Sequence, residues 1–324
     1  MAASRGHDHG RVIGPCRELG VPAHPRIGRT LPCREPAMNP MLEIRRWLEE
    51  TYGLNLDVVG TDALERNVGR RIKAQGVTGL SDYVRLWRAS LDERNELLQD
   101  MLVSETWFFR EPPAFEVLKQ WLLERMPRWA LGHRLRILVL PCATGEEAWS
   151  VAAVIHGLGI AVDQVEIEAM DVNASALARA KEGVYPLRKS KDPRPLAPLG
   201  TASGDLIHVD PALRPMVRFE RVNAMDREQF QSRRAYDVIF CRNLLIYMGA
   251  SARLQVFETL SAQLAAGGIL FLGHAEQPPP DQGWQRLRVS GAFAWHRSTD
   301  PSHGKDSPRS GHDVAIEIFR GGLK

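Results

Sequence analysis

The sequence predicts an α/β protein in which a doubly wound, mostly parallel sheet follows a smaller all-α domain. Two observations support this class. From about residue 134 onwards, short apolar runs of strand length alternate with amphipathic helical segments, as in open parallel sheets. Before that point, apolar residues recur only at helical spacing. The 324 residues, 44% of them hydrophobic, are enough for one large core or two smaller ones.

Residues 41–103 contain four segments of helical spacing. Thr61 and Ser81 are the expected N-caps of the second and third helices, and Gly76 is expected to end the second. The fourth helix is expected over residues 91–102. The apolar stripes of the first three helices are Ile44, Trp47 and Leu48, then Leu64, Val68 and Ile72, then Tyr83, Val84 and Trp87.

The sheet begins with the apolar run from Leu135 to Leu140, which predicts a buried parallel strand followed by a tight turn and a helix from Glu146. The segment 186–217 is too long and too rich in proline for a simple crossover, so we expect a small inserted lobe there. Further strands are predicted over 165–172, 217–222, 236–241 and 269–272, with a final pair near Leu287 and 292–295, and helices through 176–180 and over 252–265.

The two ends of the chain differ in composition from the segments between them. Residues 1–40 lack periodicity, and we expect either a disordered leader or an over-extended start with initiation at Met38 or Met41. Residues 298–324 predict a disordered tail. Between them we expect a helical domain over 41–103, a linker over 104–133 that carries the first ligand contacts, and the sheet domain over 134–297.

Charge and cysteine content exclude several classes. A net charge of +3 does not indicate nucleic-acid binding, and no apolar run approaches the roughly 18 residues that a membrane span needs. The four cysteines show neither a disulfide framework nor metal-ligand spacing. We therefore expect a cytoplasmic protein without a metal site, in which Cys142 and Cys241 are core residues.

Polar residues gather where the predicted parallel strands end, which is where open sheets bind ligands. Asp171 ends the second strand and suits two ribose hydroxyls. Glu146 and Glu147 begin the helix that follows the first strand. Their carboxylates would repel a phosphate and favour a ligand with positive charge. Amide side chains follow the next two strands, at Asn223 and Asn243. This set predicts a pocket for a ligand that combines adenosine with a positively charged tail, and S-adenosylmethionine is such a ligand.

Five segments, in this order, closely resemble the CheR chemotaxis methyltransferases, which methylate receptor glutamates with S-adenosylmethionine. The resemblance covers about residues 41–297 and implies the seven-stranded fold of S-adenosylmethionine-dependent methyltransferases. The residues of these motifs are most similar to those of the branch that serves Wsp-type surface-sensing systems. That branch usually carries C-terminal tetratricopeptide repeats, which this sequence does not show. The segments are SETWFFRE (104–111), LPCATGEEAWS (140–150), AMDVNASALARAKEGVY (169–185), YDVIFCRNLLIYM (236–248) and GGILFLGHAE (267–276).

The resemblance also implies roles for single residues. Arg110 and Tyr247 match residues at the methyl-transfer site, and we expect them to orient the acceptor carboxylate. Asp171 matches the ribose-binding acid, and Glu147 a cofactor-binding glutamate. Family members commonly have asparagine where this chain has Ser104. The complete set of implied cofactor contacts is Ser104, Thr106, Arg110, Gly145, Glu146, Glu147, Asp171, Asn223, Ala224, Arg242 and Asn243.

The function implied is the conversion of receptor glutamates to methyl esters, with S-adenosylhomocysteine as the second product, in bacterial chemosensory adaptation. Two alternatives stay open: a methyltransferase with another substrate, and a non-catalytic adaptor that only binds the cofactor. We expect a monomer whose partner is the cytoplasmic helices of a methyl-accepting receptor, with no nucleic acid and no membrane insertion. Basic residues on the second helix form either a solvated face or a docking surface for these helices. They are Arg66, Arg70, Arg71 and Lys73.

Overall fold

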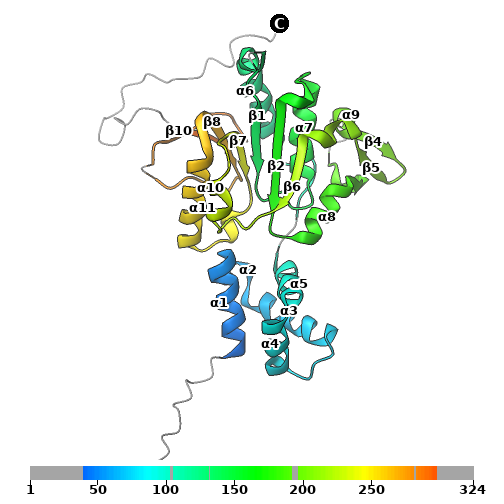
Figure 1. Ribbon diagram of the computed structural model, residues 1–324, viewed down its shortest axis with the longest axis vertical. Helices are drawn as coiled ribbons and strands as arrows, with labels where there is room; N and C mark the ends of the chain where they lie inside the picture. The colour runs from blue at the N-terminus through cyan, green and yellow to red at the C-terminus, as the bar shows by residue number, and fades with distance from the viewer. Residues whose placement is uncertain (1–38, 103–104, 131, 192–195, 281, 298–324) are drawn as a thin grey trace, which may run out of the picture. The chain divides into compact units, whose positions relative to one another are not determined.

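The computed structural model describes residues 39–102, 105–130, 132–191, 196–280 and 282–297, whose helices and strands are drawn in Figure 1 and belong to the same structural unit. Residues 1–38 of the expected leader, the expected tail, and Ser104 among the site residues lie outside the described residues, and Pro40 already belongs to the first helix. None of the helices described is long and apolar enough for a membrane span. We propose the division of the chain into a helical domain over 41–103, a linker over 104–133 and a sheet domain over 134–297.

The segment from Pro40 to Met101 is built from helices, as predicted. Their apolar stripes meet in one core that includes Ile44, Leu48, Val68 and Trp87. A short helix that the sequence did not predict, α2, follows the first, and Asn55 caps it by accepting the Asp57 N–H at 3.0 Å. The elements are α1 (Pro40–Tyr52), α2 (Leu56–Val59), α3 (Thr61–Ala74), α4 (Leu80–Ala89) and α5 (Leu91–Met101).

The two predicted N-caps are wrong. Thr61 and Ser81 lie inside the first turns of α3 and α4, which Gly60 and Gly79 precede without any side-chain cap. Gly60 has a φ of 103°, a conformation that glycine adopts at little cost. Helices α3 and α4 therefore begin one and two residues earlier than the polar side chains suggested.

Arg71 is not part of an open basic face, contrary to its predicted place in a docking surface. Its guanidinium donates to both oxygens of Glu93, at 2.8 and 2.5 Å, and the Glu93 side chain is only 3% exposed. Gln75 and the Tyr83 hydroxyl donate to the same carboxylate. Glu93 comes from α5, so the tertiary packing of α3 against α5 buries this arginine. The other three predicted docking residues, Arg66, Arg70 and Lys73, are exposed.

The main sheet has seven strands in the order β6-β2-β1-β7-β8-β10-β9. Five neighbouring strands pair in parallel, and β10 runs antiparallel to both β8 and β9. The predicted first strand, turn and helix are confirmed. The strands are β1 (Leu135–Val139), β2 (Val165–Asp171), β6 (Val217–Arg221), β7 (Tyr236–Cys241), β8 (Leu264–Leu272), β9 (Trp284–Arg286) and β10 (Ala294–Arg297).

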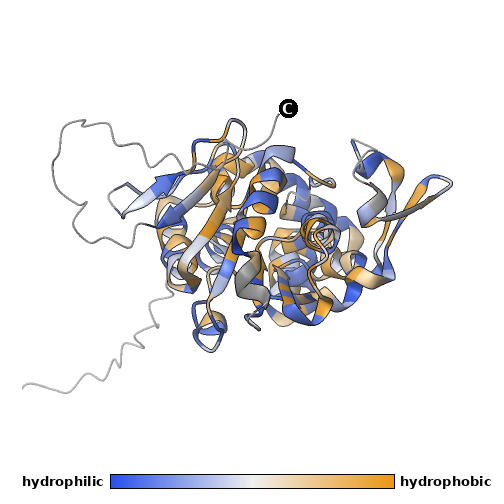
Figure 2. Cartoon of the chain, turned by 90° about the horizontal axis from the view of Figure 1, so that it is seen from above, coloured by the Kyte–Doolittle hydropathy of each residue, from blue (hydrophilic) through white to orange (hydrophobic). Residues whose placement is uncertain are grey.

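Helices cover both faces of this sheet, with hydrophobic segments between them (Figure 2), so the doubly wound class is confirmed. Ile137 and Val139 pack into one core with α6 and α7, whereas Leu138 and Leu140 pack into another with α11. This alternation follows from the two-residue period of a strand. Each fully buried aliphatic side chain stabilises the fold by about 1.5–3 kcal/mol. The covering helices are α6 (Pro112–Ala130), α7 (Glu146–Gly157), α8 (Ala174–Glu182), α10 (Glu228–Gln231) and α11 (Ala250–Gln263).

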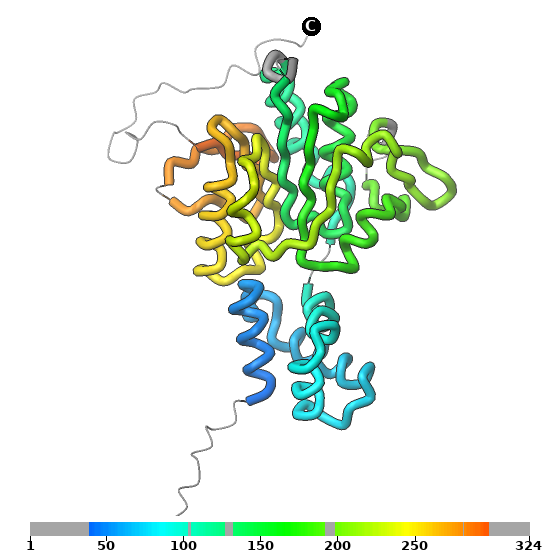
Figure 3. The backbone as a smooth tube through the Cα atoms, viewed as in Figure 1, coloured from blue at the N-terminus to red at the C-terminus, as the bar shows by residue number. Residues whose placement is uncertain are grey.

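A second, three-stranded antiparallel sheet occupies the predicted inserted lobe, which leaves the main sheet after α8 and returns before β6 (Figure 3). Its short helix α9 (Leu196–Leu199) contacts α7. Its strands, in the order β3-β5-β4, are β3 (Val184–Pro186), β4 (Gly200–Ser203) and β5 (Leu206–Val209). The described residues also form the 3-10 turns η1 (Val162–Gln164), η2 (Leu187–Lys189), η3 (Pro211–Met216) and η4 (Leu245–Tyr247).

Two predicted boundaries are wrong. Strand β8 begins at Leu264, five residues earlier than predicted, and α11 ends at Gln263, two residues earlier than predicted. The Gly267-Gly268 pair lies inside the strand. A Cβ on Gly268 would come within 2.9 Å of the Asp237 carbonyl oxygen. Gly268 therefore allows close approach to the neighbouring strand, and the glycine pair does not end the helix. Helix α6 was not predicted, although Phe115, Leu118 and Leu122 have helical spacing and are buried.

Candidate functional site

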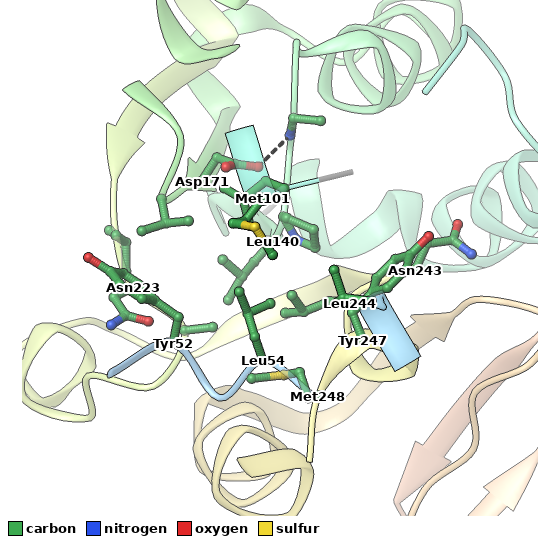
Figure 4. A pocket seen from close by; sticks show the side chains of 17 residues that line it. Tyr52, Leu54, Met101, Leu140, Asp171, Asn223, Asn243, Leu244, Tyr247 and Met248 are labelled. Carbon is green, nitrogen blue, oxygen red and sulfur yellow. Dashed lines mark hydrogen bonds between the residues drawn. The ribbon is translucent and has the colours of Figure 1, made fainter. Parts of the chain in front are cut away.

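A pocket opens where β1, β2, β6 and β7 end, and it brings together residues that are far apart in the sequence (Figure 4). In Figure 4, Asp171 lies on one side and Asn243 and Tyr247 lie together on another. Five predicted site residues line the pocket: Asp171, Asn223, Ala224, Asn243 and Tyr247. Sequence reasoning missed the wall that comes from the helical region, which includes Tyr52, Leu54, Val59 and Met101.

Asp171 is held in place by backbone donors. Its two oxygens accept the N–H groups of Ala143 at 2.7 Å and of Asn173 at 2.8 Å. Burial raises the pKa of Asp171, and these backbone donors partly oppose the rise. The N-cap of α8 is Asn173, whose side chain accepts the Ala176 N–H. Asp171 is therefore not the cap of that helix, and its carboxylate faces the pocket in a fixed orientation.

The turn after β1 requires glycine at Gly145. Its φ of 93° is a left-handed conformation, and a Cβ there would lie 2.7 Å from the Ala180 Cβ and 3.0 Å from the Tyr185 hydroxyl. Ala143, two residues earlier in the same turn, also has a positive φ, of 45°, and donates its N–H to Asp171. The turn can therefore pack closely on α8 while its backbone supports the pocket carboxylate.

A buried charge cluster lies at the start of α7. The guanidinium of Arg242, whose side chain is 1% exposed, donates to Glu147 and lies 2.8 Å from Glu111. Burial raises the pKa of Glu147, whereas Arg242 and then Arg110 lower it. Glu111 and Glu147 flank Arg242, with Arg110 nearby, so the cluster offers groups of both charges to a ligand. The structure thus brings Glu147, Arg242 and Arg110 together, beside but not among the residues that line the pocket.

Glu146 faces away from this cluster. Its fully buried carboxylate accepts the Thr144 hydroxyl at 2.6 Å and lies 3.0 Å from Lys189 Nζ. Lys189 also donates to the Thr106 carbonyl oxygen at 2.8 Å. Although Glu146 was predicted as a cofactor contact, the structure instead places it in the junction between the turn, the segment at Thr106 and the root of the inserted lobe.

Arg110 lies beside an aromatic ring. Its guanidinium lies 4.5 Å from the centre of the Trp107 ring and donates to the Glu105 carbonyl oxygen. Thr106 and Arg110 are not among the pocket-lining residues. Their predicted cofactor and acceptor contacts stay predictions.

Asn223 makes its side-chain hydrogen bonds within the protein. Its Nδ2 donates to the Thr51 carbonyl oxygen at 2.7 Å, and its Oδ1 accepts the Met225 N–H at 3.0 Å. A lining residue of the sheet domain is thereby tied to the helical region, which explains how that region comes to form part of the wall.

The donor set fits S-adenosylmethionine. A fixed buried carboxylate, Asp171, suits ribose hydroxyls, and the largely apolar wall with Tyr52 suits an adenine ring. The carboxylates around Arg242 suit the amino acid end. Sheet order, the reversed strand β10 and a pocket at the carboxyl ends of the strands define the class of S-adenosylmethionine-dependent methyltransferases.

Comparison with known proteins places the chain within this class. Residues 104–291 match the model of the CheR methyltransferase, SAM binding domain. The chain is 35% identical over 209 residues to chemotaxis protein methyltransferase 2 of Vibrio cholerae, covering 62% of this chain and 72% of that protein. It is 32% identical over 251 residues to chemotaxis protein methyltransferase 1 of Pseudomonas aeruginosa, covering 74% and 91%. The chain therefore belongs to the CheR methyltransferase family.

The chain is also similar to known proteins of the Wsp branch. The chain is 33% identical over 259 residues to the probable biofilm formation methyltransferase WspC of Pseudomonas putida, covering 78% of this chain. It spans 60% of the length of that protein, and 64% of the length of WspC from Pseudomonas aeruginosa.

Proposed function

We propose that this chain transfers the methyl group of S-adenosylmethionine to glutamate side chains of a methyl-accepting chemoreceptor, in bacterial chemosensory adaptation. Family membership supports the reaction class. The observation that carries the proposal is the convergence of Asp171, Asn243 and Tyr247 on one pocket beside the buried Glu147–Arg242 pair. A receptor's cytoplasmic helices are the expected substrate, and we place the protein, as a monomer, in the cytoplasm with them.

The chemistry demands little proton transfer from the protein. S-adenosylmethionine supplies a methyl group on a positively charged sulfur. An acceptor glutamate is ionised at pH 7, because its reference pKa is near 4.3, and needs no strong general base. One carboxylate oxygen bonds to the methyl carbon as the carbon–sulfur bond breaks, which leaves a methyl ester and a neutral thioether.

The protein's own task is mainly to orient the two reactants. Holding reacting atoms in line can lower the barrier by several kcal/mol, up to about 7–11 kcal/mol. A very polar site would stabilise the charged reactants more than the transition state. The apolar side chains around Tyr247, among them Leu54, Leu244 and Met248, agree with this requirement. We assign orientation of the acceptor carboxylate to the Tyr247 hydroxyl and to Arg110.

Receptor docking is proposed for the exposed basic residues of α3. These are Arg66, Arg70 and Lys73. Arg71 is excluded because Glu93 pairs with it. The exposed edge strand β4 of the inserted lobe is a second candidate contact, since a receptor peptide could pair with its backbone.

The first test is calorimetric titration of the full chain with S-adenosylhomocysteine, repeated on Asp171→Ala. We expect micromolar or tighter binding that the substitution removes. Transfer of labelled methyl groups to a receptor fragment then separates an enzyme from a non-catalytic adaptor. Binding without transfer to any receptor would favour the adaptor, and no binding to the folded protein would exclude both.

A further inference from the structure

The loop after β7 is anchored by a carboxylate from a distant part of the chain. Glu276 follows β8 and is 5% exposed. Its Oε2 accepts the N–H groups of Gly273 at 2.7 Å and of Asn243 at 2.9 Å. Its Oε1 accepts those of Leu245 at 2.7 Å and of Ile246 at 3.3 Å. Four backbone donors therefore converge on one buried side chain, and three of them belong to the loop.

The three donors of the loop belong to irregular or uncapped backbone. Asn243 has a φ of 59°, in the left-handed region, which asparagine adopts more readily than most residues other than glycine. The 3-10 turn η4 that follows begins without a side-chain cap of its own. Its first N–H groups, on Leu245 and Ile246, would otherwise have no acceptor within the turn. The carboxylate of Glu276 serves as that acceptor, and charged acceptors make the stronger hydrogen bonds.

The other end of the loop is held by the helical region. Met248 forms an antiparallel bridge with Leu54, and the Tyr247 carbonyl oxygen accepts the Asn55 N–H at 2.7 Å. The anchor at Glu276 also explains a glycine. A Cβ on Gly273 would lie 2.8 Å from Glu276 Oε2 and 2.9 Å from Asn243 Nδ2. The loop is thus fixed at both ends, and Asn243 and Tyr247 face the pocket between them.

We infer that Glu276 is a positioning residue of the methyl-transfer site. It does not line the pocket and acts through the loop, holding Asn243 for the cofactor and Tyr247 for the acceptor. The role of Tyr247 rests on the proposed function, whereas the role of Asn243 requires only that the cofactor binds in this pocket.

The test compares Glu276→Gln with Glu168→Gln. Glutamine preserves volume but replaces one accepting oxygen with a donor. Glu168 is a matched control, because it is 3% exposed and binds the Tyr236 hydroxyl and Arg218 away from the pocket. Three quantities are measured on the full chain: the thermal midpoint, the affinity for S-adenosylhomocysteine, and the rate of methyl transfer at saturating cofactor.

We expect both substitutions to lower the thermal midpoint. Only Glu276→Gln should weaken S-adenosylhomocysteine binding and slow methyl transfer, the latter on the order of 10²-fold, as for a displacement of about 1 Å in a reacting group. Gly273→Ala, which crowds the same carboxylate without changing charge, should have the same selective effect on the site.

Wild-type affinity and transfer rate in folded Glu276→Gln would overturn the inference and leave Glu276 a stability residue only. A wild-type protein that binds S-adenosylhomocysteine but methylates no receptor would refute the proposed function instead. The affinities of the two variants would still decide the role of Glu276 in that case.

Discussion

Asn223 donates its side-chain amide to the carbonyl oxygen of Thr51 at 2.7 Å, across 172 positions of sequence. Asn223 lines the pocket, and Thr51 precedes Tyr52, which lines it from the helical region. This one hydrogen bond therefore joins the two walls between which we expect the adenine ring to bind.

Asn223→Ala should lower the free energy of unfolding by about 1 kcal/mol and weaken S-adenosylhomocysteine binding, because it releases the two walls from each other. Asn95→Ala is a matched control. Asn95 accepts a 2.6 Å hydrogen bond from Arg221, which also joins the helical region to the sheet but lies outside the lining residues. Denaturant titration and calorimetry measure both effects. Equal affinity in the two variants would contradict the prediction.

Glu147→Gln should weaken cofactor binding while changing the pH dependence of stability. Burial raises the pKa of Glu147 above its ordinary value near 4.5, so the folded state retains this proton to higher pH than the unfolded state. The corresponding stability is present below the ordinary pKa and is lost as pH rises through the folded pKa. Glutamine removes this titration.

Unfolding measured between pH 4 and pH 8 checks the sign of that effect. The wild type should lose stability relative to Glu147→Gln as pH rises above about 4.5. A constant difference between the two proteins across the range would show that Glu147 titrates in the folded state as it does in the unfolded state.

Glu93→Ala should destabilise the helical region by about 3–5 kcal/mol, since it leaves the largely buried Arg71 without its main partner. Glu96→Ala is the control. Glu96 lies 3.5 Å from the same arginine but is 51% exposed, so its loss should change stability by no more than about 0.5 kcal/mol. Denaturant unfolding followed by circular dichroism measures both. Similar small effects would mean that the buried pair contributes no more than a surface pair.

Gly145→Ala should abolish S-adenosylhomocysteine binding or prevent folding, because its Cβ would collide with Ala180 and the backbone would be strained as well. Gly159→Ala tests the backbone strain without the collision. Gly159 has a φ of 73°, yet a Cβ there meets nothing within 4 Å, so only about 1 kcal/mol of strain is expected. Normal ligand binding by Gly145→Ala would show that α8 can move away from the turn.

Reversing the charges of Arg66 and Lys73 to glutamate should raise the receptor KM on the order of tenfold at low salt, with cofactor affinity unchanged. The control reverses Lys119 and Arg179, two exposed cations on α6 and α8. Methylation kinetics at two salt concentrations measure the effect. An equal change in both pairs would indicate a response to net charge and not to a docking surface.

The sequence by itself indicated the strands of the main sheet, because apolar runs and turn residues are local signals, but it did not indicate helices α2 and α6. It also indicated Asp171, Asn243 and Tyr247, because the carboxyl ends of parallel strands must meet at one edge of a sheet. The structure confirms that these three residues line one pocket.

Only the tertiary structure showed that adjacent residues of the same type have different partners. Arg70 is exposed, whereas Arg71 is paired with Glu93, because α5 packs on one side of α3. Glu146 meets Lys189, whereas Glu147 meets Arg242. Each pair is adjacent in sequence and differs only in what distant segments bring to it.

The same reason explains why the anchor at Glu276 and the wall at Tyr52 were missed. Both act on the pocket through contacts with residues far along the chain, and no local spacing encodes such contacts. The sequence therefore specified which chemical groups are present at the sheet edge. Long-range packing decided which of them face the ligand and which hold the others in place.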